Sequence, residues 1–210
     1  MHNNITHIFI AFFLSFMLLA CNDTNLPQVG KHYTVLPHQL IQDSNPHLPV
    51  EYFFSLNCQS CFELDQHIAK HTPKFETDLH RIHITHNQQE QLAAISYYAA
   101  FEQDNEKQFS PLLLKLYESQ LLYAALPLTD KQQILEDIFY RKKMISPYLL
   151  TENLKETIYL QLRESRELSR LYDVSELPTI IIHGQYQVDL SSHDTFEQLF
   201  DTIEHLLKKK

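Results

Sequence analysis

Cysteine, glycine and positive charge are all scarce in this chain. Its three cysteines include one closely spaced pair, Cys58 and Cys61, but no second such pair and no Cys–His pair that would complete a zinc site. Lysine and arginine number 17 against 26 aspartates and glutamates, and the formal charge of −9 argues against nucleic acid as a main partner. With 210 residues the chain can bury a core of its own, so disulfides are not needed as staples.

The apolar run at the start of the chain, residues 8–20, is shorter than the about 20 residues of a typical membrane-spanning helix. Its length is that of the hydrophobic part of a signal peptide. The run ends in Leu18-Leu19-Ala20-Cys21, which resembles the bacterial lipobox, where the cysteine receives lipid. This resemblance implies a lipoprotein signal peptide at residues 1–20, lipid on Cys21 and a tether at residues 21–28. An ordinary signal peptide followed by a chance cysteine is the alternative.

The closely spaced cysteines follow a second apolar run, residues 50–56, in the order Cys58-Gln59-Ser60-Cys61. Apolar residues then recur at helical spacing, which predicts a buried strand leading into a helix that carries both cysteines in its first turn. Residues three apart share one helix face, so the two sulfurs can bond without unwinding the turn.

The position of Cys58 at a helix N-terminus predicts its chemistry. Unpaired amides and a partial positive charge at that end favour a thiolate. We therefore expect Cys58 to be the exposed nucleophile with a lowered pKa, and Cys61 to be the more buried, resolving thiol. A structural disulfide and half of a metal site are the alternatives; we expect no metal and no cofactor.

The remaining pattern divides the chain into two flanks around a helical block. Strand-like runs occur at residues 30–36, 50–56 and 79–85, and again at 179–183 and 186–190, with Gly184 in the turn between the last two. Helical patterns fill residues 88–172, with starts expected at Thr129-Gln132, as a capping box, and at Ser146-Pro147. Asp194 with Glu197 is expected to open a last helix. The histidines at 80, 83 and 86 do not share one face of a strand, because their spacing is three, and this argues against the alternative of a metal site. We expect them to be solvated.

The predicted fold class is therefore α/β, with one mixed central sheet interrupted by an all-helical insertion. We expect the first part of the sheet domain at residues 29–87, the inserted helical domain at 88–166 and the second part at 167–210. The two flanks must pair into a single sheet across the insertion.

Four segments of these flanks resemble the DsbA-type thiol:disulfide oxidoreductases of the bacterial periplasm, which have the thioredoxin fold. They are residues 30–34 (Gly-Lys-His-Tyr-Thr), 53–61 (from Phe53-Phe54-Ser55 to Cys61), 174–179 (Val-Ser-Glu-Leu-Pro-Thr) and 182–188 (Ile-His-Gly-Gln-Tyr-Gln-Val). The helical block agrees with the family in length and kind only.

The resemblance implies roles for individual residues. Cys58 would exchange with substrate sulfur and Cys61 would resolve the mixed disulfide. Pro178 would be a cis-proline facing the Cys58 sulfur, and Leu177, Pro178 and Thr179 would bind an extended substrate peptide. The implied partners are exported cysteine-containing proteins and a DsbB-like membrane protein that reoxidises the pair. The implied place is the periplasmic side of the envelope, with the protein held at a membrane by lipid and acting as a monomer.

Two departures from the family pattern change the expected chemistry. Gln59-Ser60 stands between the cysteines where the family's strong oxidant has Pro-His, so the thiolate should be held less strongly and the couple should be less oxidising. We expect a potential between roughly −120 and −270 mV, the range of such proteins. Tyr52 occupies the position of a buried acid, and Glu51, one residue earlier, should point to the opposite face of the strand, leaving water or another acid to handle the proton of Cys61.

The sequence thus favours an exported thiol:disulfide oxidoreductase. A disulfide reductase or isomerase using the same pair is the closest alternative. A non-enzymatic module of this fold that binds peptide or copper is the alternative of another class.

Overall fold

A computed structural model describes residues 26–37, 49–71, 79–85, 87–104 and 111–209. Cys21, the signal peptide and most of the tether lie outside these residues. Within them no helix is long and apolar enough to cross a membrane. The elements, in chain order, are β1 (Tyr33–Val35), β2 (Val50–Phe54), α3 (Gln59–His71), β3 (Leu79–His83), α5 (Gln88–Gln103), α6 (Pro111–Leu121), α7 (Leu128–Arg141), α8 (Glu152–Leu171), β4 (Thr179–Ile182), β5 (Tyr186–Val188), the 3₁₀ helix η1 (Leu190–Ser192) and α9 (Phe196–Leu207).

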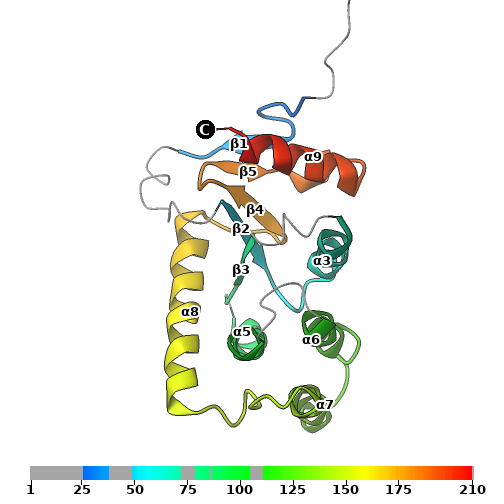
Figure 1. Ribbon diagram of the computed structural model, residues 1–210, viewed down its shortest axis with the longest axis vertical. Coiled ribbons are helices and arrows are strands. Elements are labelled where there is room, and N and C mark those ends of the chain that lie inside the picture. The colour runs from blue at the N-terminus through cyan, green and yellow to red at the C-terminus, as the bar shows by residue number, and fades with distance from the viewer. Residues whose placement is uncertain (1–25, 38–48, 72–78, 86, 105–110, 210) are drawn as a thin grey trace, which may run out of the picture.

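Both flanks of the chain pair into one five-stranded sheet, in the order β1-β5-β4-β2-β3. The β2–β3 pair is parallel and the other pairs are antiparallel. Strands β2 and β4, although far apart in sequence, are neighbours, with Val50 opposite Ile182 and Phe53 opposite Thr179. The predicted mixed sheet with an inserted helical part is confirmed (Figure 1). The exact domain boundaries stay a prediction; α8 itself continues to Leu171.

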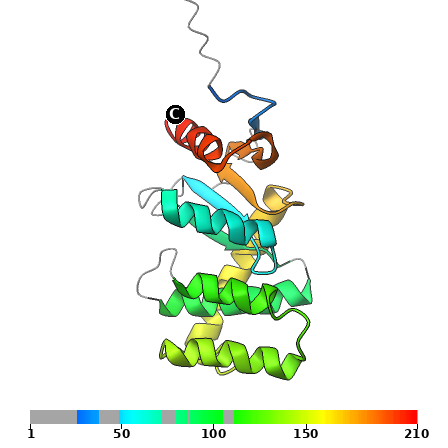
Figure 2. The same cartoon turned by 90° about the vertical axis from the view of Figure 1, so that its right-hand side faces the viewer.

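The two faces of the sheet bury different cores because successive strand residues alternate between faces. Tyr52 and Phe54 of β2 point into the larger core, which also contains residues of α3, α5, α6 and α9. Phe53, between them, points into a smaller core with Ile181 and Tyr172 at the end of α8. Figures 1 and 2 show α8 along one side of the molecule and helices α5, α6 and α7 stacked below the sheet and α3.

The hairpin between β4 and β5 follows the prediction from Gly184. His183 and Gly184 both have positive φ, 54° and 63°, and the Gln185 amide donates to the Ile182 carbonyl at 2.9 Å. Positive φ at both central residues is typical of the tight turn whose twist matches antiparallel strands, and glycine adopts it at little cost.

Three predicted helix starts are wrong. The N-cap residue of α7 is Pro127, two residues before the Thr129 of the predicted capping box, because the Pro127 carbonyl already accepts from the Lys131 amide and proline has no N–H that needs a partner at a helix start. Ser146-Pro147 forms a turn, in which the Ser146 carbonyl accepts from Leu149.

The helix after that turn is α8, and Thr151 caps it by accepting from the Leu154 amide. The last predicted start, at Asp194, is displaced by one residue. The side chain of Thr195, rather than Asp194, accepts from the Gln198 amide and caps α9.

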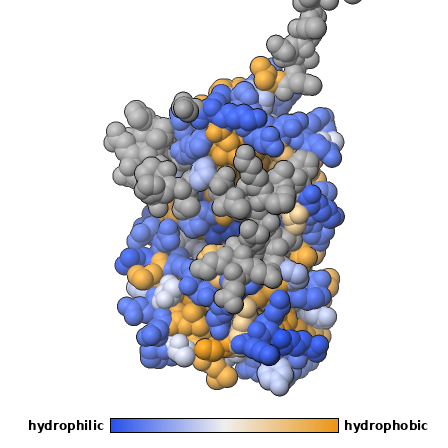
Figure 3. Space-filling model, viewed as in Figure 1, coloured by the Kyte–Doolittle hydropathy of each residue, from blue (hydrophilic) through white to orange (hydrophobic). Residues whose placement is uncertain are grey.

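Large apolar side chains are exposed at the helical end of the molecule. Leu128 is 71% exposed at the start of α7, and Leu149 is 74% exposed just before α8. Figure 3 shows hydrophobic patches towards that end of the visible face. The cysteine pair lies elsewhere, at the first turn of α3.

Candidate active site

The two cysteines lie at the junction between strand β2 and helix α3, as predicted. After Phe54 the chain turns, and the Cys58 amide donates to the Ser55 carbonyl at 3.0 Å. The Cys58 carbonyl then accepts from the Phe62 amide at 3.1 Å, which places Cys58 immediately before the first helical turn. Cys58 and Cys61 are joined by a disulfide.

Two hydrogen-bond donors lie close to the sulfur of Cys58. The amide of Cys61 points at it from 3.1 Å, and the hydroxyl of Ser60 lies 3.4 Å away. No acidic residue occupies the first turn of α3. The first-turn amides carry partial positive charge, so a negative charge that develops on this sulfur is stabilised.

Access differs between the two sulfurs as expected from the sequence. Cys61 is fully buried, whereas Cys58 is partly exposed. An incoming thiolate can therefore reach Cys58 and not Cys61. Gln59 is exposed, and its side-chain amide donates to Glu63 at 2.9 Å, away from the sulfur.

The segment before β4, the strand that pairs with β2, lies close to the cysteine turn. The peptide bond between Leu177 and Pro178 is cis, as the sequence interpretation expected. Ser60 links the two segments, since its hydroxyl lies 3.5 Å from the Leu177 carbonyl oxygen. The Thr179 hydroxyl turns back and donates to the Glu176 carbonyl at 2.7 Å.

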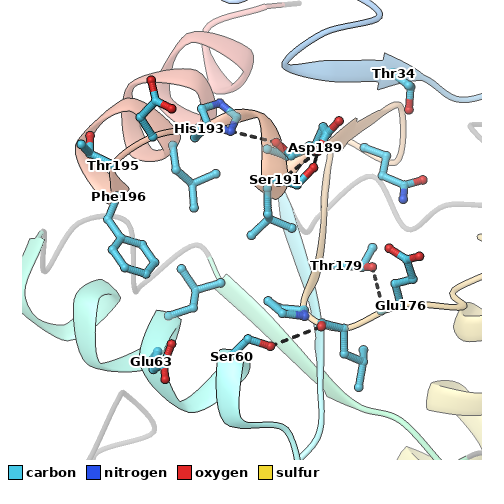
Figure 4. Close-up of a pocket in the computed structure, with 18 of the residues that line it drawn as sticks. Thr34, Ser60, Glu63, Glu176, Thr179, Asp189, Ser191, His193, Thr195 and Phe196 are labelled. Atoms are coloured by element: carbon cyan, nitrogen blue, oxygen red, sulfur yellow. Dashed lines mark hydrogen bonds between the residues drawn. The ribbon is translucent and has the colours of Figure 1, made fainter.

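A cavity of about 690 Å³ opens beside this junction. It lies between α3, the segment around the cis-proline and the stretch from the end of β5 to the start of α9 (Figure 4). Its volume falls in the range of about 300–1,000 Å³ typical of ligand sites. Of the predicted peptide-binding and dipeptide residues, the cavity is lined by Ser60, Leu177, Pro178 and Thr179.

Comparison with solved structures agrees with this architecture. The DsbA disulfide interchange protein of Klebsiella pneumoniae superposes with a TM-score of 0.66 over 87% of this chain and 98% of its own, at 17% sequence identity. The chain has the DsbA fold. The disulfide oxidoreductase DsbA of Proteus mirabilis (TM-score 0.64, 16% identity, 89% and 100% coverage) and the oxidoreductase NmDsbA1 of Neisseria meningitidis (0.60, 22%, 86% and 92%) are also similar. No model of a known protein family matches the chain.

Tyr52 occupies the position at which the DsbA pattern has a buried acid. A different acid, Asp65 of α3, lies in the same region. Asp65 is fully buried one helical turn beyond Cys61. One carboxylate oxygen of Asp65 accepts two hydrogen bonds from Arg81, at 3.0 and 3.1 Å, and the other accepts one from the Tyr117 hydroxyl at 2.6 Å. Burial raises the pKa of the Asp65 carboxyl, and Arg81 and Tyr117 act in the opposite direction.

Tyr52 connects this buried acid to the cysteine turn. Its hydroxyl donates to the Cys61 carbonyl at 3.2 Å, and it lies close enough to Asp65 for the two groups to interact electrostatically. Sequence reasoning left the place of the acid open and did not identify Asp65. The available signal was its spacing, because residue i+4 from Cys61 shares the buried face of the helix.

Glu51 points away from the cysteines, as strand alternation predicts. It is 3% exposed on the opposite face of β2, next to Tyr172 and Glu164 of the α8 region. Burial is the main cause that raises the pKa of Glu51 to about 7; the nearby Tyr172 side chain acts to lower this pKa and the charge of Glu164 acts to raise it. Glu51 therefore takes no part in the cysteine chemistry.

Of the three histidines expected to be solvated, His80 is half-buried and His86 lies outside the described residues. The expectation is wrong for His83, which is fully buried because β3 is covered on both sides at its end. Its Nε2 accepts from the Leu56 amide at 3.0 Å, and its Nδ1 donates to the Ile84 carbonyl at 2.8 Å. Burial lowers its pKa to about 4, so the ring is neutral. The described residues contain no group of three or more metal-ligating side chains.

Proposed function

We propose that the protein is a thiol:disulfide oxidoreductase that introduces or exchanges disulfides in exported proteins through Cys58 and Cys61. The proposal rests on one structural arrangement. A disulfide lies at a helix N-terminus, and its accessible sulfur is 3.4 Å from the hydroxyl of Ser60, which lines a cavity together with the cis-proline segment. A structural disulfide does not require donors around one sulfur or a cavity beside it.

In the oxidising direction, a substrate thiolate attacks the Cys58 sulfur and the Cys58–Cys61 bond breaks. The electron pair leaves on Cys61, and substrate is now bonded to Cys58. A second substrate thiolate then attacks the substrate sulfur of this mixed disulfide and expels Cys58 as a thiolate. The substrate is oxidised by two electrons and the pair is reduced to a dithiol. The Cys61 amide and the Ser60 hydroxyl stabilise the departing Cys58 thiolate.

The substrate segment would lie in the cavity, next to Leu177, Pro178 and Thr179. A cis-proline has no amide of its own to donate, so the carbonyl of Leu177 and the neighbouring backbone supply polar contacts for an extended peptide. We place the protein on the periplasmic side of the bacterial envelope, anchored by lipid on Cys21 and acting as a monomer. A DsbB-like membrane protein would reoxidise the pair.

Replacing Cys61 tests the proposal directly. With Cys61→Ser, the Cys58 thiolate should attack the disulfide of an oxidised peptide and stop at a mixed disulfide, because serine does not resolve it. The adduct should appear by mass spectrometry under non-reducing conditions and vanish with reductant. Cys58→Ser is the matched control and should form none. Absence of any adduct with Cys61→Ser would sink the oxidoreductase proposal.

A further inference from the structure

The charged side chains that line the cavity near the disulfide are acidic. Four carboxylate side chains line it, from three different parts of the fold: Glu63 on α3, Glu176 before the cis-proline, and Asp189 and Asp194 in the stretch between β5 and α9. Figure 4 shows Glu63, Glu176 and Asp189 on different sides of the opening. All four residues are exposed. Among the described lining residues there is no lysine or arginine.

These charges are not neutralised by neighbouring groups. In the described part of the chain none of the four carboxylates forms an ion pair with lysine or arginine. Glu63 accepts from the Gln59 amide, and Asp189 accepts from Ser191, but both partners are neutral. The one basic ring in the lining belongs to His193. Burial lowers its pKa, and its ring nitrogens contact the Asp189 carbonyl and the Thr202 hydroxyl.

We propose that the cavity selects substrate segments in which a lysine or arginine lies close to the reacting cysteine. This rests on the proposed oxidoreductase function and adds a substrate class to it. Basic side chains in the cavity would face carboxylates on several sides, and acidic ones would be repelled. Because the four carboxylates are exposed, the preference acts mainly on the rate of encounter and weakens with salt.

The test compares two dithiol peptides that differ only in whether lysine or glutamate flanks the cysteines. The second-order rate constant for reduction of the Cys58–Cys61 disulfide is measured at about 0.01 M and about 1 M ionic strength, where the Debye length falls from about 30 to about 3 Å. Flanking lysine also makes any thiol more acidic. Each rate is therefore divided by the rate of the same peptide with a small neutral disulfide, hydroxyethyl disulfide.

The expected result is a normalised preference for the lysine peptide of about tenfold at low salt, collapsing towards unity at high salt. Glu176→Gln combined with Asp194→Asn should remove most of this preference. Glu152→Gln combined with Glu156→Gln changes the net charge equally at the start of α8, at the far end of the molecule, and should leave the preference in place (Figure 1).

Two results would overturn the proposal. Equal normalised rates for the two peptides would do so while leaving the oxidoreductase function standing, since both peptides would still react. An equal loss of preference in the two double variants would assign the effect to net charge rather than to the cavity. If neither peptide reduces the disulfide, the oxidoreductase function fails and the substrate class fails with it.

Discussion

At the scale of single residues, the chemistry depends on what surrounds the Cys58 sulfur. The Cys61 amide is fixed by the helix, whereas the Ser60 hydroxyl is supplied by the side chain and is shared between the sulfur and the Leu177 carbonyl. A hydroxyl donates to a thiolate less strongly than a cationic group does. This is the structural reason to expect a milder oxidant than a protein with histidine at the Ser60 position.

Ser60→Ala should lower the reduction potential of the pair by up to roughly 30 mV, which is tenfold in the equilibrium constant with glutathione. The reduced form loses one donor to its thiolate, and the oxidised form loses little. Gln59→Ala is the matched control, because the Gln59 side chain bonds to Glu63 and not to the sulfur. A potential that stays the same or rises in Ser60→Ala would show that the hydroxyl does not stabilise the thiolate.

Asp65→Asn should lower the free energy of unfolding by about 3–5 kcal/mol, because it breaks a buried ion pair: the Arg81 side chain is only 7% exposed and loses the charge of its Asp65 partner. Urea unfolding at neutral pH measures this. Asp137→Asn removes the carboxylate of the exposed pair with Arg141 and should cost less than about 1 kcal/mol. Equal losses in the two variants would mean that the buried pair is no more important than the exposed one.

At the scale of secondary-structure elements, the end of β3 joins the inserted helices to the sheet. The His83 backbone amide donates to the Tyr98 hydroxyl of α5 at 3.1 Å. The His83 carbonyl accepts from the Ser165 hydroxyl of α8 at 2.5 Å. Its ring holds the Leu56 amide just before the cysteine turn. One residue thus ties α5, α8 and the active-site turn together.

His83→Phe should lower the free energy of unfolding by about 1–3 kcal/mol at neutral pH, since it keeps the ring but leaves the buried Leu56 amide unpaired. Chemical unfolding gives the value. His205→Phe, in the last turn of α9, serves as a comparison at a less buried histidine and should have a smaller effect. A loss below about 0.5 kcal/mol in His83→Phe would contradict the role assigned to this hydrogen bond.

How much the sequence predicts also differs between elements. The cysteine helix and the hairpin at Gly184 carry local signals, so apolar periodicity and one glycine suffice to find them. The start of α7 depended on competition between Pro127 and Thr129, which local patterns do not resolve. The spacing from Cys61 indicates only that Asp65 lies on the buried face of its helix. Its pairing with Arg81 and the burial of His83 depend on contacts between elements, which no spacing within one element reveals.

At the scale of the whole molecule, two buried groups oppose each other in the dependence of stability on pH. The raised pKa of Glu51, about 7, means that the folded state keeps a proton that the unfolded state loses above about 4.5. Stability therefore falls as pH rises from about 4.5 to 7. The lowered pKa of His83, about 4, means that as pH falls below about 6.5 the unfolded state binds a proton that the folded state does not bind until about pH 4. The contribution of His83 to the free energy of unfolding therefore rises as pH increases from about 4 to 6.5.

Glu51→Gln removes the first of these effects. The difference in unfolding free energy between this variant and the unaltered protein should increase by up to about 3 kcal/mol between pH 4.5 and 7.5. Unfolding curves across this range measure it. A difference that is independent of pH would show that Glu51 titrates normally in the folded protein. Glu152→Gln, at an exposed carboxyl, is the control and should show no such trend.

The reduction potential of the Cys58–Cys61 pair tests the central claim most directly. The domain beginning after Cys21 is equilibrated in glutathione buffers, and the fraction of reduced pair is followed by thiol labelling. A redox-active pair at this helix N-terminus should cycle reversibly, with a potential between roughly −120 and −270 mV. A potential below about −300 mV, as is typical of structural disulfides, or a pair that does not cycle at all, would contradict the account.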